Sequence, residues 1–377
     1  MRTFGLGIIG CGVISAVYFR NAPLFKGLKV VACADVDPGA AAVRAKAFGV
    51  RALSAADLLG SPEVDIVVNL TPPNAHHAVS MAALKAGKHV FTEKPLAARA
   101  ALGRKLVDAA RRRGLSIASA PDTFLGAAGR KARALIDSGA IGRPTTGAAF
   151  VFGHGMEHWH PAPEFFYKPG GGPVLDLGPY YLTMLVNLIG PIVRVQALTS
   201  IGEARRLVTA PGPNKGAWID VETPTTALAL LEFEGGAHVV VGMSWDVWRH
   251  GAAPIEIHGT QGSLRMPDPN FFGGIVEVSE RGENWTPHDA KDDAFGAPNQ
   301  PAENPSLANY RVLGIADLAA AIRGGRSPRA GGDLALHVLE AMEAILRAGA
   351  RGRAIRLQKA GVRPAVLSED EARSFLA

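Results

Sequence analysis

The chain of 377 residues is 47% hydrophobic and 20% charged, a composition typical of a globular protein with a large core, which excludes a disordered chain. Its 40 Lys and Arg exceed its 34 Asp and Glu, giving a formal charge of +6, but the basic residues are scattered, which argues against nucleic-acid binding. With two cysteines, no apolar leader and no apolar run long enough to span a membrane, we expect a cytoplasmic protein without disulfides or a membrane partner.

Strands and helices alternate over the first third of the chain. Strands are predicted at 4–9, 28–34, 64–70, 88–92 and 115–119, and helices at 13–21, from 38 onward, at 74–85 and at 97–113. Strands that alternate with helices indicate a parallel, doubly wound sheet. We therefore assign residues 1–121 to an α/β Rossmann domain that binds a dinucleotide.

The pattern changes after residue 120, where strands dominate. Strands are predicted at 145–152, 193–200, 226–233, 237–245, 255–258 and 275–278, helices at 125–136, 179–189, 311–323 and 333–347, and a long loop at 281–305. Several of these strands alternate in polarity, as expected of a sheet with one covered face. Residues 122–377 are predicted to form an α+β domain with a largely antiparallel open sheet, which binds substrate and supports oligomerisation.

A glycine turn, Gly10-Cys-Gly-Val-Ile-Ser15, lies between the first strand and the first helix. Gly10 permits the tight turn, and Gly12 lets the backbone approach a pyrophosphate at the helix N-terminus. The turn, including Val13 and Ile14, is therefore predicted to bind a dinucleotide. The alternative is an ordinary strand-to-helix turn.

Asp35 ends the second strand, 20 residues after Ser15. A carboxylate at this place accepts hydrogen bonds from the adenosine ribose and repels a 2′-phosphate, which favours NAD over NADP. The alternative for Asp35 is a cap on the helix that begins at Pro38, a role for which Asp37 is the better candidate.

Three motifs in this order carry a family resemblance: the glycine turn, Glu93-Lys94-Pro95, and Gly170-Gly-Gly-Pro-Val-Leu-Asp-Leu-Gly-Pro-Tyr180. Over residues 1 to about 190 the chain resembles the Gfo/Idh/MocA oxidoreductases. Many members have a histidine where this chain has Tyr180. The chain is more similar to the branch that contains glucose–fructose oxidoreductase and dihydrodiol dehydrogenase, which has a tyrosine there.

The resemblance implies roles for individual residues. Lys94 matches the lysine beside nicotinamide and substrate, and Asp176 matches an aspartate that contacts substrate. The resemblance also places a group of residues against the cofactor: Asn69, Thr71, Pro72, Asn74, His77, Glu93 and Lys94. Pro95 completes the lysine motif, and its peptide bond can be cis.

Lys94 and Tyr180 suit the proton step of alcohol oxidation. A free tyrosine titrates near about 10, and a neighbouring ammonium favours its phenolate. We hypothesise that Tyr180 is the general acid/base and that Lys94 orients the hydroxyl and tunes Tyr180. The reverse assignment is open, as are purely structural roles: a solvated Lys94, a packed Tyr180 and a capping Asp176.

The segment 153–168 contains three histidines and a glutamate, but its spacing fits no usual zinc pattern, so no metal is expected. Because it leads into Asp176, we expect it to border the pocket and to bind substrate through His158, Trp159, His160 and Lys168. The alternative is a structural loop.

These features predict an NAD-dependent oxidoreductase of a sugar, cyclitol or related polyol, and the resemblance suggests a homodimer or homotetramer. One alternative is an NADPH-dependent reductase of keto-sugars or imines, against which Asp35 argues. Another is an inactive sensor that binds cofactor or ligand without turnover, against which the presence of both Lys94 and Tyr180 argues.

Overall fold

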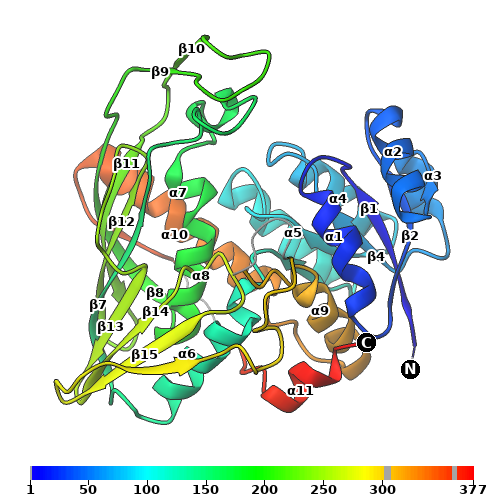
Figure 1. The fold of residues 1–377 in the computed structure, drawn as a ribbon. Helices are drawn as coiled ribbons and strands as arrows, with labels where there is room; N and C mark the ends of the chain where they lie inside the picture. The colour runs from blue at the N-terminus through cyan, green and yellow to red at the C-terminus, as the bar shows by residue number, and fades with distance from the viewer. Residues whose placement is uncertain (1, 301–306, 359–362) are drawn as a thin grey trace.

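The computed structural model describes residues 2–300, 307–358 and 363–377. Two β-sheets organise the chain (Figure 1). The N-terminal sheet is surrounded by helices, whereas the second sheet forms one side of the molecule. Helices α8 and α10 lie between the two sheets.

The first sheet has six parallel strands in the order β3-β2-β1-β4-β5-β6. Its elements are β1 (Phe4–Ile9), α1 (Ser15–Asn21), β2 (Leu28–Ala34), α2 (Pro38–Phe48), β3 (Arg51–Ala52), α3 (Ala55–Gly60), β4 (Ile66–Asn69), α4 (His76–Lys85), β5 (His89–Thr92), α5 (Ala100–Arg112) and β6 (Ile117–Ser119). The central strands β1 and β4 are buried throughout, as their apolar sequences require in a sheet covered on both faces. This order confirms the predicted Rossmann fold.

The second sheet has nine strands in the order β16-β15-β14-β13-β7-β12-β11-β8-β17. Its strands are β7 (Pro144–Phe152), β8 (Ile192–Ser200), β11 (Thr226–Phe233), β12 (His238–Ser244), β13 (Ile255–Gly259), β14 (Gly262–Met266), β15 (Ile275–Glu280), β16 (Thr286–Asp289) and β17 (Ile355–Arg356). Strands β7 and β12 pair in parallel and the other neighbours pair antiparallel. The predicted, largely antiparallel sheet is confirmed.

The remaining elements lie around this sheet. They are α6 (Ala127–Asp137), α7 (Pro173–Asp176), α8 (Gly178–Ile189), β9 (Arg205–Leu207), β10 (Trp218–Asp220), α9 (Leu313–Gly324), α10 (Gly332–Arg351) and α11 (Glu369–Ser374), with short 3-10 turns at Ala22–Leu24, Thr123–Leu125 and Glu164–Tyr167. Strands β9 and β10 pair only with each other and project beyond the end of the sheet (Figure 1).

One face of the second sheet is covered and the other is open. Along β11, Ala229 and Leu231 are buried toward the helices, whereas Leu228 and Leu230 are exposed on the opposite face. Helix α10 contacts β8 on one side and α5 and β6 on the other, so it joins the two sheets.

The C-terminal segment returns to the first sheet. Leu376 forms a β-bridge with Phe25, and α9 packs against β5 and β6, where Gly314 lies against Phe91. Elements from the range 122–377 thus complete the surroundings of the cofactor domain, and the boundary at residue 121 stays a prediction.

Several element boundaries were predicted wrongly. Helix α1 begins at Ser15 rather than at residue 13, because residues 12–14 form the turn, and α5 begins at Ala100 rather than at 97. The predicted loop 281–305 contains strand β16, and its residues 301–305 lie outside the described part. The short elements β3, α3, α7, β9, β10, β14, β17 and α11 were not predicted.

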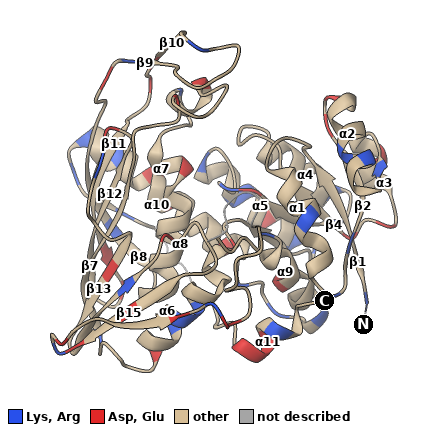
Figure 2. Ribbon diagram, viewed as in Figure 1, with Lys and Arg blue, Asp and Glu red and all other residues tan. Residues whose placement is uncertain are grey.

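Within the described residues, no helix is long and apolar enough to cross a membrane. Acidic and basic residues are interspersed over both halves of the molecule (Figure 2).

Candidate active site

The glycine turn after β1 leaves an open cradle at the carboxyl edge of the first sheet. Gly10 has φ +104, and a side chain there would collide with the carbonyl carbon of Leu70 at 2.6 Å. A side-chain carbon on Gly12 would meet no atom within 4 Å. The apolar side chains of Val13 and Ile14 are exposed beside it, at 91% and 38%. Space at Gly12 and uncovered apolar side chains fit a bound dinucleotide.

Asp35 lies against this turn. Its Oδ2 accepts a hydrogen bond of 2.6 Å from the backbone N–H of Cys11, and its Oδ1 accepts one of 3.0 Å from Asp37. Asp37, and not Asp35, caps α2 by accepting from the N–H of Gly39. The capping role expected of Asp37 is therefore confirmed, and the Asp35 carboxylate is fixed at the turn.

Arg44 of α2 was not included among the sequence-based candidates. Its guanidinium donates to the carbonyl oxygens of Cys11 and Gly12 at 3.3 and 3.2 Å. A positive charge therefore lies on the same turn as the Asp35 carboxylate.

The side chain of Asn69 holds the loop after β4 through hydrogen bonds. This side chain is fully buried, its Oδ1 accepts from the N–H and hydroxyl of Thr71, and its Nδ2 donates to Ser80 and to the carbonyl of His76. The amide is occupied by the protein itself, and the predicted contact of Asn69 with a cofactor stays a prediction. Pro72 and Asn74 are exposed on that loop.

His76 connects the loop to the lysine motif. It is buried, with Nδ1 2.7 Å from the carbonyl oxygen of Pro95 and Nε2 2.7 Å from that of Thr71. Burial lowers the pKa of His76, although both carbonyl contacts oppose that shift. A neutral imidazole has one N–H and satisfies only one of these acceptors, whereas an imidazolium satisfies both.

His77 has different neighbours. Its Nε2 is buried without a hydrogen-bond partner, and burial together with Lys105 of α5 lowers its pKa. Of the two adjacent histidines, His76 is the one that contacts the loop, which the sequence did not reveal because both follow the same turn.

The Glu93-Lys94-Pro95 motif follows β5. Glu93 is buried and accepts hydrogen bonds from the Tyr18 hydroxyl at 2.7 Å and from the Lys94 N–H at 3.0 Å. The Lys94–Pro95 peptide bond is cis. Glu93 therefore fixes the backbone of the motif to α1 through Tyr18, while the Lys94 side chain extends toward the second domain.

Lys94, Asp176 and Tyr180 come together at the junction of the two domains. The Lys94 Nζ donates to Oδ1 of Asp176 at 2.6 Å and to its carbonyl oxygen at 2.7 Å, and lies 5.4 Å from the centre of the Tyr180 ring. Asp176 ends α7 and Tyr180 lies in the first turn of α8, which begins at Gly178. Burial disfavours the ammonium of Lys94, but the charges of Asp176 and Tyr180 outweigh it and raise the pKa of Lys94.

Arg311 completes this cluster and was not foreseen. Its Nη2 lies 3.5 Å from the Tyr180 hydroxyl and 2.8 Å from Oδ1 of Asn270. The contact joins residues 131 positions apart. Because Arg311 precedes α9 outside any recognised motif, the sequence alone carried no signal for it.

The segment 153–168 precedes the glycines that lead into α7. His158 and Trp159 are exposed, His160 packs edge-on against Trp159, and Lys168 pairs with Glu222 at 2.7 Å. Backbone hydrogen bonds connect the segment to α7, since the N–H of Gly172 donates to the carbonyl of Phe166 and the N–H of Asp176 donates to that of Gly172. A substrate role for these four side chains stays a prediction.

A buried ionic network holds this segment in place. Glu157 accepts from Arg206 at 3.2 Å and from the Tyr167 hydroxyl, and Arg206 also pairs with Asp246. Among the described residues, no group of three or more His, Cys, Asp or Glu is arranged to hold a metal ion.

Comparison with known proteins identifies the family and several relatives of this chain. Residues 4–120 match the family model "Oxidoreductase family, NAD-binding Rossmann fold", and residues 130–265 match the "GFO/IDH/MocA C-terminal domain". The chain is 27% identical over 361 residues to 1,5-anhydro-D-fructose reductase of Ensifer adhaerens, covering 93% of this chain and 98% of that protein. It is 31% identical over 273 residues to dTDP-3,4-didehydro-2,6-dideoxy-alpha-D-glucose 3-reductase of Streptomyces violaceoruber, covering 71% and 73%.

The fold has a close counterpart among solved structures. A crystal structure of an NAD-binding oxidoreductase from Klebsiella pneumoniae matches with a TM-score of 0.80 at 24% identity, covering 95% of this chain and 100% of that chain. A Rossmann domain joined to this second sheet, with a lysine at the junction, defines a two-domain oxidoreductase. The chain belongs to the Gfo/Idh/MocA family of these enzymes.

Proposed function

We propose that the enzyme transfers hydride between a hydroxyl-bearing carbon of a sugar, cyclitol or related polyol and the nicotinamide of NAD. The observation that carries this proposal is the Lys94 ammonium held between Asp176 and the Tyr180 ring, at the carboxyl edge of the first sheet. The names of the relatives, which act on anhydro- and dideoxysugars, support the substrate class.

The nicotinamide, when bound, supplies the carbon that accepts or returns the hydride. The glycine turn and Asp35 bind the cofactor, and Asp176 fixes the Lys94 ammonium. Lys94 then orients the substrate hydroxyl, and the Tyr180 oxygen takes its proton as the carbonyl forms. The raised pKa of Lys94 supports this division of roles over the reverse, because a firmly protonated lysine is a poor proton acceptor.

Cofactor preference depends on Asp35. Its carboxylate lies at the turn, where it favours the ribose hydroxyls of NAD. The second candidate, an NADPH-dependent reductase of keto-sugars or imines, is favoured by Arg44, whose guanidinium on the same turn is a donor for a 2′-phosphate.

Calorimetric titration with NAD(H) and NADP(H) separates these readings. Tighter binding of NAD(H) supports the dehydrogenase, and tighter binding of NADP(H) supports the reductase. Failure to bind either cofactor, after removal of any that copurifies, would overturn the proposal.

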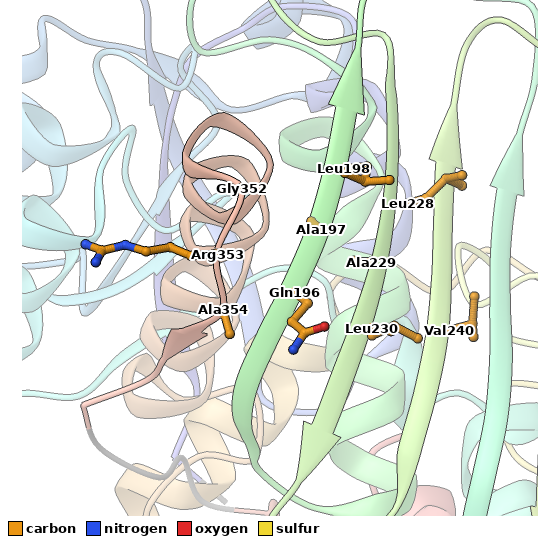
Figure 3. Close-up of a pocket in the computed structure, with 10 residues that line it drawn as sticks. All are labelled: Gln196, Ala197, Leu198, Leu228, Ala229, Leu230, Val240, Gly352, Arg353 and Ala354. Atoms are coloured by element: carbon orange, nitrogen blue, oxygen red, sulfur yellow. The ribbon is translucent and has the colours of Figure 1, made fainter.

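We further propose that two copies pair through the open face of the second sheet. Leu228 lies opposite Leu198, and Leu230 lies opposite Val240, so exposed apolar side chains from β8, β11 and β12 lie side by side (Figure 3). A second copy presents the same apolar face, and a two-fold axis would bring the two faces together.

We also propose a cytoplasmic location, because both cysteines are free and buried, as expected in a reducing compartment.

A further inference from the structure

Arg311 contacts the Tyr180 oxygen, and the other side-chain groups that accept hydrogen bonds from its guanidinium are neutral amides. Besides the 3.5 Å contact with the Tyr180 hydroxyl, its guanidinium donates to Oδ1 of Asn270 at 2.8 Å and to Oδ1 of Asn309 at 2.9 Å. Within the described residues, no carboxylate forms an ion pair with it. The carboxylates of Glu93, Asp122 and Asp268 act on its charge without forming a direct ion pair, whereas the Tyr180 oxygen is contacted by the guanidinium itself.

The direction of this contact follows from chemistry. A guanidinium has only donors, so the hydrogen bond runs from Arg311 to the Tyr180 oxygen. The hydroxyl hydrogen of Tyr180 is left free to be donated into the site. When the proton has left, the same guanidinium faces a phenolate, and charge-assisted hydrogen bonds are stronger than neutral ones.

We propose that Arg311 is a positioning residue for proton transfer, which orients the Tyr180 hydroxyl and stabilises the charge on its oxygen. The proposal rests on the proposed function, in which Tyr180 exchanges a proton with substrate. Two cations contact Tyr180: the Lys94 ammonium lies over its ring, and the Arg311 guanidinium lies at its hydroxyl oxygen. Both positive groups are placed to stabilise the negative charge that develops on the Tyr180 oxygen when its proton is transferred.

The backbone around Arg311 is fixed relative to the cofactor domain. The Nδ2 of Asn21, at the end of α1, donates to the carbonyl oxygens of Asn309 and Arg311 at 2.8 and 3.0 Å. Asp122 accepts from the N–H groups of Val312 and Gly314 at 3.1 and 2.8 Å. Arg311 thus extends from a segment tied to the first domain to a tyrosine of the second.

The backbone next to Arg311 is strained at Val312. This residue has φ +106, a conformation that a β-branched residue adopts only under strain. Strained backbone persists where the surrounding contacts hold it, and it gathers at functional sites. The strain lies directly beside Arg311 and the two hydrogen bonds to Asp122.

The test is a double-mutant cycle between Arg311→Met and Tyr180→Phe, with turnover and NAD affinity measured for each variant. We expect Arg311→Met to lower kcat by about 10- to 100-fold, the factor of one charge-assisted hydrogen bond, with the Kd for NAD within about twofold. It should also move the rise of oxidation rate to higher pH. In the Tyr180→Phe background the same substitution should have no further effect.

Chemical rescue keeps the test decisive if the methionine variant folds poorly. Arg311→Ala should regain turnover when guanidinium chloride is added at concentrations below those that unfold the protein, and Asn309→Ala should lose less activity than either variant. Equal losses from Arg311→Met in both backgrounds, or no rescue, would overturn the role of Arg311. Full turnover by Tyr180→Phe would instead overturn the proposed function itself.

Discussion

Lys94 and Asp176 are joined by a 2.6 Å ion pair although they lie in different domains, one after β5 and the other at the end of α7. The pair fixes the lysine ammonium in front of α8, which carries Tyr180 in its first turn. These three side chains thus come together only when the two domains are packed against each other.

Replacing Asp176 with Asn should release the Lys94 ammonium while leaving the helix intact. We expect kcat to fall by about 100-fold, with a loss of about 1 kcal/mol in stability, because the pair is largely but not fully buried. Steady-state kinetics and thermal unfolding measure both. The matched control is Asp293→Asn. This variant breaks a 2.9 Å ion pair between Asp293 and Lys131 that lies outside the candidate site, so it should leave kcat unchanged. Equal kinetic losses in the two variants would contradict the catalytic role of the pair.

Replacing Asp35 with Asn should relax cofactor discrimination. The amide oxygen still accepts from the Cys11 N–H, but the charge that repels a 2′-phosphate is gone. We expect the ratio of NADP to NAD affinity to rise about tenfold by calorimetry. Asp37→Asn, at the neighbouring helix cap, should leave that ratio unchanged. If the two variants discriminate alike, Asp35 does not select the cofactor.

His76→Leu should disturb the cofactor loop more than His77→Leu. The first substitution removes both contacts to Thr71 and Pro95, so the loop and the Lys94 segment lose their shared support. We expect the Kd for NAD to rise about tenfold and kcat to fall as well. Binding titrations with NAD compare the two variants, and a larger effect at His77 would contradict this expectation and support the sequence-based prediction that His77 contacts the cofactor.

His337 should make the protein less stable in acid. Burial lowers its pKa to about 4, and its Nε2 accepts from the N–H of Ile192 at 3.0 Å only when neutral. The unfolded chain binds the proton more tightly, so this contribution is complete above about pH 6.5 and is lost as the pH falls toward 4, up to roughly 3 kcal/mol. Denaturant unfolding of His337→Gln, which accepts but does not titrate, should show a shallower loss across that window. Parallel curves would contradict the assignment.

Placing Glu at both Leu228 and Leu230 should separate the proposed dimer. Charges at the centre of an apolar interface are costly to bury, whereas they are solvated in a monomer. Sedimentation should show the wild type as an oligomer and the double variant as a monomer. Val43→Glu, at an apolar residue of α2 that is 66% exposed, is the control and should not change the mass. A monomeric wild type would contradict the proposed pairing.

The sequence predicted the elements that have strong local signals. Alternating strands and helices indicated the parallel sheet, and the three motifs indicated Lys94, Asp176 and Tyr180 as candidate site residues. Two-residue strands such as β3 carry too little pattern to be recognised. Arg311 and His76 could not be singled out, because their roles depend on contacts between loops that only the folded chain brings together.

The most direct test of the account is a turnover screen: the rate at which reduced nicotinamide forms from NAD with a panel of aldoses, cyclitols and polyols. The account predicts NAD-dependent turnover of at least one member of the panel, reduced at least about 100-fold by Lys94→Met. NAD binding without turnover of any panel member, and without oxidation of NADH by the corresponding keto-sugars, would contradict it and identify the protein as a sensor.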